Sequence, residues 1–210
     1  KTADGSNTIS SKNSESRSFD PALAIKGITL ENKGTNPLWI ELEASGYPLK
    51  LPIPSTEKIS LERKWFTVAG KPWSGGNLKV GDMLIVRVTA KSKQVIEDAL
   101  VIDHIPAGLE VENLNISQGP QAGEFSIDGV NLAAAMADER IKHKEYRDDR
   151  FVAAVRLSGS PINLFYMLRV VTPGRFHVPG TYAEDMYRPD IRAYGPSPEA
   201  VNVVDPRGGK

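Results

Sequence analysis

From Ile59 to about Val204 the chain repeats one pattern, short runs rich in β-branched and aromatic residues separated by turn residues. Runs of this kind are typical of strands, and glycine, proline, asparagine and serine between them are typical of turns. Two runs are apolar on both faces, which predicts strands in the middle of a sheet. The pattern therefore predicts an all-β fold, an antiparallel β-sandwich with little helix. The clearest predicted strands are 83–88, 99–103, 151–157 and 164–171.

One segment departs from this pattern and predicts a single amphipathic helix over 129–146. Its apolar residues recur at helical spacing, while charged residues cover the opposite side. Asp128 stands where the first turn would take its cap. We expect this helix to lie on the sandwich as a connection between strands. The apolar positions are Val130, Ala133, Ala134, Ala137 and Ile141.

The part before the sandwich is different in composition. Residues 2–18 are rich in Ser, Asn and Lys and too poor in apolar residues to offset the entropy cost of ordering, which predicts a tether. Residues 38–43 alternate between apolar and charged side chains, which predicts a half-buried antiparallel strand. Prolines at 48, 52 and 54 favour a linker. We therefore predict a tether with a partial β-segment over 1–55, one β-sandwich over 56–206 and a tail over 207–210.

Charge and cysteine content exclude several classes of protein. Lys and Arg number 26 and Asp and Glu number 26, so the chain has no basic footprint for nucleic acid. The absence of cysteine excludes disulfides, thiolate nucleophiles and sulfur-ligated metals within this sequence. No apolar run is long enough to cross a bilayer, so we expect any export signal or lipid anchor to lie outside this sequence.

The residues that could carry catalysis or bind metal lack the spacing that such chemistry needs. His104, His143 and His177 lie far apart, and Glu139 with His143 is more typical of a solvated pair than of a metal site. Asp148 and Asp149 would point to opposite faces of a strand and could not share a substrate atom; an Arg/Asp cluster at a helix-to-strand corner fits better. We therefore expect no enzyme activity, no metal and no cofactor.

The C-terminal stretch 182–194 is the candidate for an interaction site. It concentrates aromatics, Met and Arg, the residue types enriched in interface cores, in what reads as a loop. Residue types alone leave two interpretations open. The side chains could contact a partner, or they could pin the loop to their own sandwich. The candidates are Tyr182, Met186, Tyr187 and Arg188.

Several ordered motifs give the chain a resemblance to the C-terminal region of bacterial α2-macroglobulins. Each motif is modest alone, and their order and spacing from Ile59 to Ala193 make the resemblance specific. A weaker likeness to the second half of the family's CUB domain lies at Asn36-Pro37-Leu38-Trp39 and Ser45-Gly46-Tyr47-Pro48. The main motifs are 78–88, 98–103, 105–110, 147–154, 169–174 with 178–179, and 184–189.

The resemblance implies a partial CUB-type β-segment up to about Ser55, followed by the terminal macroglobulin-type β-sandwich. The family traps proteases through a thioester carried by another domain, so the expected partners are the thioester domain of the same parent chain and, through the parent, target proteases. The family also places a tyrosine of the terminal domain over the thioester. Met186 and Tyr187 occupy the matching motif, with Tyr182 and Arg188 as expected support.

The same resemblance implies a periplasmic location, with any lipid anchor of the parent outside this fragment. Two other functions also fit a sandwich of this kind. One is an adhesion or scaffold module, which would make no selective contact with a thioester domain. The other is a ligand-binding module, which would keep a concave aromatic pocket.

Overall fold

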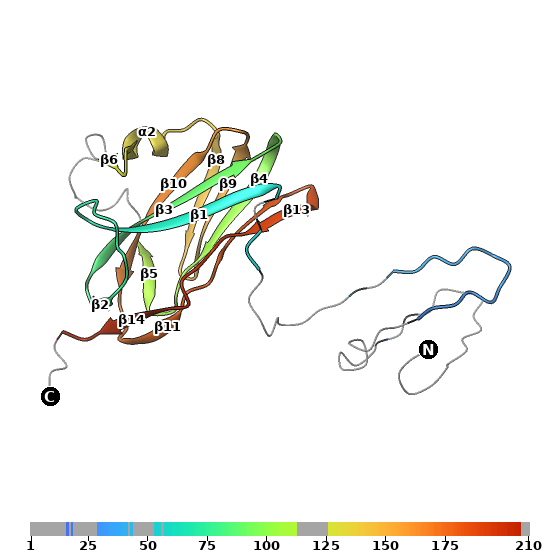
Figure 1. Ribbon diagram of the computed structural model, residues 1–210, viewed down its shortest axis with the longest axis horizontal. Coiled ribbons are helices and arrows are strands. Elements are labelled where there is room, and N and C mark those ends of the chain that lie inside the picture. Colours follow the sequence, from blue (N-terminus) through green and yellow to red (C-terminus); the bar gives the residue numbers. More distant parts are fainter. Residues whose placement is uncertain are drawn as a thin grey trace. The chain divides into compact units, whose positions relative to one another are not determined.

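The computed structural model separates into two units, Lys1–Tyr47 and Pro48–Lys210. The second contains the predicted sandwich (Figure 1). The residues that the structure describes are 16, 18, 29–41, 43, 53–55, 57–112 and 126–206.

The second unit is built almost entirely from strands. Helix α2 (Leu132–Met136) is the one helix of the described part, and no helix there is long and apolar enough to span a bilayer. The strands are β1 (Ile59–Thr67), β2 (Asn77–Lys79), β3 (Met83–Ser92), β4 (Ile96–His104), β5 (Leu109–Glu112), β6 (Ser126–Ile127), β7 (Val130–Asn131), β8 (Ile141–Arg147), β9 (Arg150–Leu157), β10 (Ile162–Val170), β11 (Gly174–His177), β12 (Thr181–Asp185), β13 (Arg188–Tyr194) and β14 (Ala200–Val204).

Two antiparallel sheets form the sandwich. One has the strand order β1-β3-β10-β5 and the other β13-β12-β4-β9-β8. A smaller sheet, β11-β14-β2, includes the parallel pair β14 and β2. Figure 1 shows this small sheet at one end of the sandwich and α2 at the other. The predicted all-β sandwich is therefore confirmed.

The core lies between the two large sheets and follows from strand alternation. In β9 every second residue is buried, beginning with Phe151 and ending with Leu157, because side chains alternate between the faces of a strand. Phe151 stacks on Tyr166 of β10 with ring centroids 4.7 Å apart, which joins the two sheets. The prediction that β10 is central is also correct, since it lies between β3 and β5.

A second apolar cluster explains why β10 is apolar on both faces. Phe165 and Met167 belong to this second cluster, together with Ile85 of the neighbouring strand β3 and Phe66 of β1. Ile127 and Leu132, from the β6–β7 hairpin and α2, cover them. Burial on both faces favours a nearly continuous apolar run, as the sequence of β10 shows.

The long helix predicted over 129–146 is wrong, because only Leu132–Met136 is helical. Its N-cap is Asn131, whose side chain accepts a hydrogen bond from the Ala134 amide at 2.8 Å. Asp128 instead occupies the turn between β6 and β7, with a φ of 51°. The N-cap thus lies three residues further along the chain than predicted.

Residues 141–146, predicted to continue the helix, lie instead in the edge strand β8, which pairs with β9. Two features divert the chain from the helix. Asp138 accepts a hydrogen bond from the Arg140 amide at 3.0 Å, a turn that competes with helical bonding. The unpaired edge of β9 then offers a full ladder of backbone partners, which outweighs weak local helix propensity.

The strand predicted over 38–43 is also wrong for the residues described there. Leu38, Trp39 and Ile40 belong to no strand, and Trp39 is 93% exposed. A strand needs a hydrogen-bonded neighbour and a surface on which to bury its apolar face. Within the described part of the first unit nothing provides them. The predicted tether and tail lie almost wholly outside the described residues.

Candidate functional site

The candidate site lies on a β-hairpin, not on the loop that its composition suggested. β12 pairs with β4 on one side and with β13 on the other, so the hairpin belongs to the five-stranded sheet. Thr181, Ala183 and Asp185 face inward and are buried. Small and polar inward residues give this segment a weak apolar pattern, which explains why its strands were not recognised.

The hairpin ends in a tight turn that one carboxylate holds together. Asp185 Oδ1 accepts hydrogen bonds from the backbone amides of Tyr187 at 2.9 Å and Arg188 at 3.1 Å. The Met186 amide donates to the carbonyl of Asp98 on β4 at 2.9 Å. Aspartate at the first position of such a turn is favoured because its side chain can accept these amides. The turn is thus tied both to itself and to the sheet.

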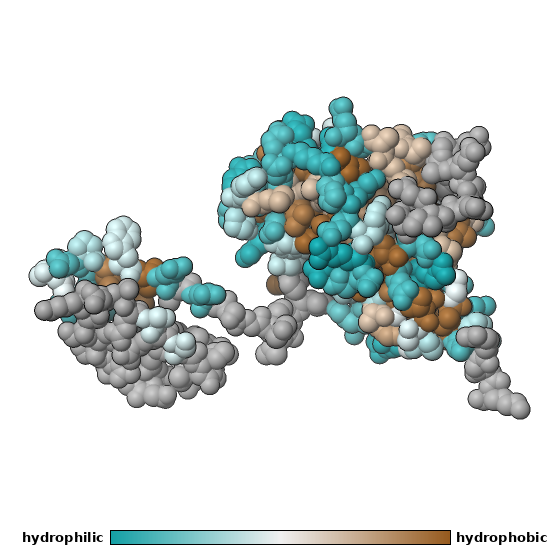
Figure 2. All heavy atoms as spheres, turned by 180° about the vertical axis from the view of Figure 1, so that it is seen from behind, coloured by the Kyte–Doolittle hydropathy of each residue, from teal (hydrophilic) through white to brown (hydrophobic). Residues whose placement is uncertain are grey.

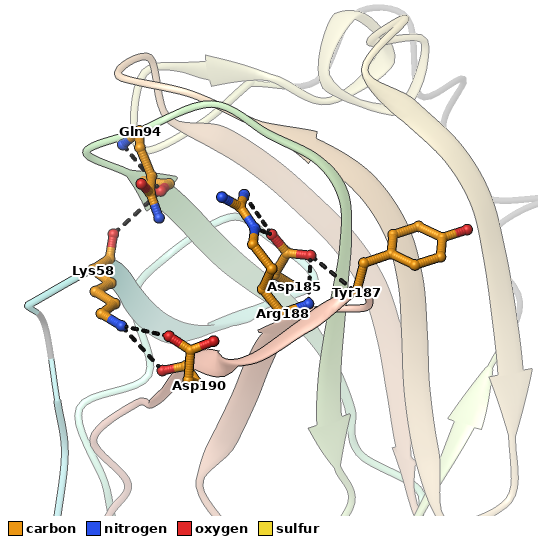
Figure 3. A network of polar contacts seen from close by, with 7 residues as sticks. Lys58, Gln94, Asp185, Tyr187, Arg188 and Asp190 are labelled. Carbon is orange, nitrogen blue, oxygen red and sulfur yellow. Dashed lines mark hydrogen bonds and ion pairs between the residues drawn. The ribbon is translucent and has the colours of Figure 1, made fainter.

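The two side chains at the apex of the turn face outward. Tyr187 is 79% exposed and Met186 is 51% exposed. Figure 3 shows the Tyr187 ring extending away from the side chains of Asp185 and Arg188. Neither side chain belongs to the core. The structure therefore gives no support to the interpretation that Met186 and Tyr187 pin this segment to its own sandwich. A large exposed aromatic on an ordered turn can enter a partner's surface with little loss of entropy.

Arg188 turns back toward the sheet. Its Nε donates to Asp185 Oδ2 at 2.7 Å, and the pair is partly shielded, with side chains 52% and 5% exposed. Burial raises the pKa of Asp185, but the Tyr187 and Arg188 donors outweigh it and lower the pKa overall. Arg188 therefore orders the turn rather than standing free beside Tyr187.

Tyr182 lies apart from the apex, near the start of β12. Its ring packs on Tyr194 with centroids 5.0 Å apart, and its hydroxyl donates to Glu184 at 2.5 Å. Burial, followed by the bond to Glu184, raises the pKa of Tyr182 well above its ordinary value. The structure thus brings Met186, Tyr187 and Arg188 together in one turn and places Tyr182 on the strand that leads to it.

Asp185 is the residue of this site that sequence reasoning missed. It holds the turn, yet its carboxylate is almost completely buried. The preference of aspartate for the first position of a tight turn is the sequence signal that could have found it.

The other candidate residues remain scattered. His104, His143 and His177 lie on β4, β8 and β11, and no group able to hold a metal ion occurs among the described residues. Asp148 and Asp149 lie in the turn between β8 and β9, where Asp149 pairs with Arg150 at 2.6 Å. The expected helix-to-strand corner is thus a strand-to-strand turn.

A surface hollow in the same unit offers little to an apolar ligand. It is lined by Arg175, His177, Glu199 and Ala200, with no Phe, Tyr or Trp. Figure 2 shows that the apolar surface on the face drawn there is divided into patches by polar side chains. The hollow at Arg175 thus differs from the concave aromatic pocket expected of a ligand-binding module.

Comparison with known families matches both parts of the chain. Residues 59–190 match the bacterial α2-macroglobulin MG10 domain, and residues 1–57 match the CUB domain of α2-macroglobulins. An α2-macroglobulin of Xylella fastidiosa is 44% identical over 192 residues, which cover 90% of this chain and 12% of that protein. The Escherichia coli protein is 41% identical over 178 residues, covering 84% of this chain and 11% of that protein.

Solved structures agree with the sequence comparison. The native conformation of E. coli α2-macroglobulin, determined by cryo-electron microscopy, is similar with a TM-score of 0.69 and 39% identity over 76% of this chain and 10% of that one. The chain thus spans about a tenth of the length of these relatives. The sandwich, its order of motifs and both family matches show that this chain belongs to the bacterial α2-macroglobulin family.

Proposed function

We propose that this chain is a non-catalytic part of a protease-trapping α2-macroglobulin, and that its sandwich packs on the thioester domain of the parent with Tyr187 shielding the thioester. The observation that supports this most is the apex of the β12–β13 hairpin. Its aromatic side chain is 79% exposed, yet its backbone is fixed by Asp185 and by Asp98. An exposed side chain of no use to its own fold, held in one place, is typical of an interface anchor.

The chemistry of a tyrosine suits this role. A thioester is lost when water or an amine reaches its carbonyl carbon. The flat apolar ring can cover such a group, and its hydroxyl can hydrogen-bond at a wet rim of the contact. Met186 adds an adaptable apolar contact beside it.

Relatives provide further support. A Salmonella α2-macroglobulin has been crystallised after reaction with methylamine. E. coli α2-macroglobulin has been determined after activation by porcine elastase and by trypsin. Those proteins respond to proteases and to a small amine. We propose the same behaviour for the parent of this chain.

The decisive experiment compares the full-length parent with its Tyr187→Ala variant. Both are incubated with labelled methylamine without protease, and incorporation is followed by intact mass. We expect the variant to incorporate methylamine much faster, because its thioester is uncovered. Met186→Ala should give a weaker version of the same effect. A Tyr187→Ala protein whose thioester survives as long as the parent's would refute the proposal.

Two controls separate shielding from loss of stability. Val95→Ala truncates another exposed apolar residue of the sandwich and should leave incorporation unchanged. In the 210-residue chain, Tyr187→Ala should cost little, since only about a fifth of the side chain is covered. Scaling the roughly 3–5 kcal/mol of a fully buried aromatic by that fraction gives about 0.6–1 kcal/mol.

A further inference from the structure

Among the described residues, one ion pair has both side chains buried, that between Arg63 and Asp103. Arg63 Nη1 donates to Asp103 Oδ1 at 2.6 Å, and the two side chains are 2% and 0% exposed. Tyr166, from the same sheet as Arg63, donates its hydroxyl to Asp103 Oδ2 at 2.6 Å. Burial raises the pKa of Asp103, although Arg63 and Tyr166 act in the opposite direction. A buried pair is seldom more stabilising than apolar residues of the same volume, and its best-attested use is to specify one arrangement.

Here the arrangement that the pair specifies is the position of the β12–β13 hairpin along β4. The second terminal nitrogen of Arg63 donates to the Pro179 carbonyl at 2.8 Å and to Ser197 Oγ at 2.7 Å. Pro179 precedes β12, and Ser197 follows β13. Ser197 Oγ also donates to the Val178 carbonyl at 2.7 Å. The Arg63 guanidinium thus binds the end of β4, through Asp103, and both ends of the hairpin, which we call its roots.

Apolar patterning alone does not settle how the hairpin is aligned with β4. In the observed register Thr181 lies opposite Asp103 and Asp185 lies opposite Ala99. A slip by one residue would turn Ala183 outward, so alternation excludes it. A slip by two residues keeps every side chain on its face and moves the apex by about 7 Å along the strand. In that register Arg63 would lose its hydrogen bonds to Pro179 and Ser197 while remaining charged and buried.

We propose that Arg63, with Asp103, is a register lock for the β12–β13 hairpin, and is thereby a positioning residue for Tyr187. The lock itself concerns only the sandwich. Its consequence for the thioester rests on the proposed function. Arginine suits the position because its planar fork reaches three acceptors at fixed angles, which the single ammonium of lysine does not.

The first test follows the position of the hairpin in the 210-residue chain. The chain has no cysteine, so nitroxide labels can be placed at Arg192→Cys on β13 and Arg147→Cys on β8, both exposed. The lock is removed by Arg63→Met with Asp103→Leu and Tyr166→Phe, which leaves no unpaired charge. Pulsed electron paramagnetic resonance should give one distance between the two labels for the parent chain. For the triple variant it should give a second distance, shifted by several ångströms. A single, unchanged distance overturns the lock.

A matched control removes an ion pair of the five-stranded sheet that does not contact the hairpin. Arg156 and Glu97 join β9 to β4 at 3.1 Å and are exposed. Arg156→Gln with Glu97→Gln should leave the label distance unchanged. A shift in this control equal to that of the triple variant also overturns the proposal, because the hairpin would then respond to any loss of charge.

A milder variant covers the case in which the triple variant does not fold. Arg63→Lys keeps the charge but loses the fork. Hydrogen exchange should accelerate at least tenfold at Gly195, whose amide donates to Thr181 at the hairpin root, and should stay unchanged within β9. Equal acceleration throughout, or none at Gly195, overturns the lock.

The two proposals fail in different ways. If Tyr187→Ala leaves the parent's thioester intact, shielding is refuted, while label distances and exchange rates still decide the lock. If Tyr187→Ala exposes the thioester but the lock variants move neither distance nor exchange rate, the lock is refuted and shielding stands.

Discussion

Replacing Asp185 by alanine should loosen the hairpin turn without touching either exposed side chain at its apex. The carboxylate accepts two backbone amides, those of Tyr187 and Arg188, at 2.9 and 3.1 Å. It also pairs with the Arg188 guanidinium at 2.6 Å. Alanine removes all of these acceptors at once, whereas Asp185→Asn keeps one carbonyl oxygen for the amides and replaces the oxygen that accepts from Arg188 with an NH2 donor.

The size of the effect follows from these contacts. Two hydrogen bonds at about 0.5–1.5 kcal/mol each give about 1–3 kcal/mol. The ion pair adds less than about 1 kcal/mol, because the Arg188 side chain is 52% exposed and solvent screens it. We therefore expect Asp185→Ala to lower the free energy of unfolding by about 1–4 kcal/mol. For a chain of this size that corresponds to a fall in Tm of about 2–16 °C.

Thermal and urea unfolding of the 210-residue chain would measure this. Asp190→Ala is the matched control, since Asp190 lies on the same hairpin and its side chain is 74% exposed. Its pairing with Lys58 is visible beside the turn in Figure 3. We expect no measurable change in Tm for this control, and an intermediate loss for Asp185→Asn. An Asp185→Ala chain as stable as the Asp190→Ala chain would refute the reasoning.

Two further results are expected. Tyr166→Phe deprives the buried Asp103 carboxylate of a donor and should cost about 1–3 kcal/mol by urea unfolding; an unchanged midpoint would contradict the assigned hydrogen bond. The pKa of Asp185 is lowered in the fold, so its contribution is present above the unfolded value of about 4 and is lost as the pH falls through the folded value. The stability difference between the parent chain and Asp185→Asn should therefore shrink below about pH 4, and a difference that stays constant from pH 7 to pH 3 would count against this assignment.

Strand alternation made much of the sandwich predictable. β9 and β10 were both predicted from runs that are apolar on both faces. β10 is indeed buried on both faces, whereas in β9 only every second residue is fully buried. β8 was not recognised, because Ala133, Ala137 and Ile141 happen to repeat at helical spacing. The deciding partner, the free edge of β9, lies beyond the reach of any local pattern.

The candidate site, too, was only partly predictable from the sequence. Residue types placed Met186 and Tyr187 in a segment suited to contacts. They could not tell an exposed turn from a buried one, because exposure depends on how the hairpin is seated against β4. Asp185 carried a recognisable turn preference, but its role appears only once the amides of the turn are seen to converge on it.

Sequence by itself determined the fold class and the family, because both depend on patterns repeated along many residues. Tertiary structure decided which charged residues lie inside. Arg63 follows Ile59 and Leu61 on the inward side of β1, and Asp103 follows Ala99 and Val101 on the inward side of β4. Alternation predicts an inward position for each of them, but a charged side chain without a partner is costly to bury. Only the packing of the two sheets brings their charges within 2.6 Å, and this pairing is what makes their burial tolerable.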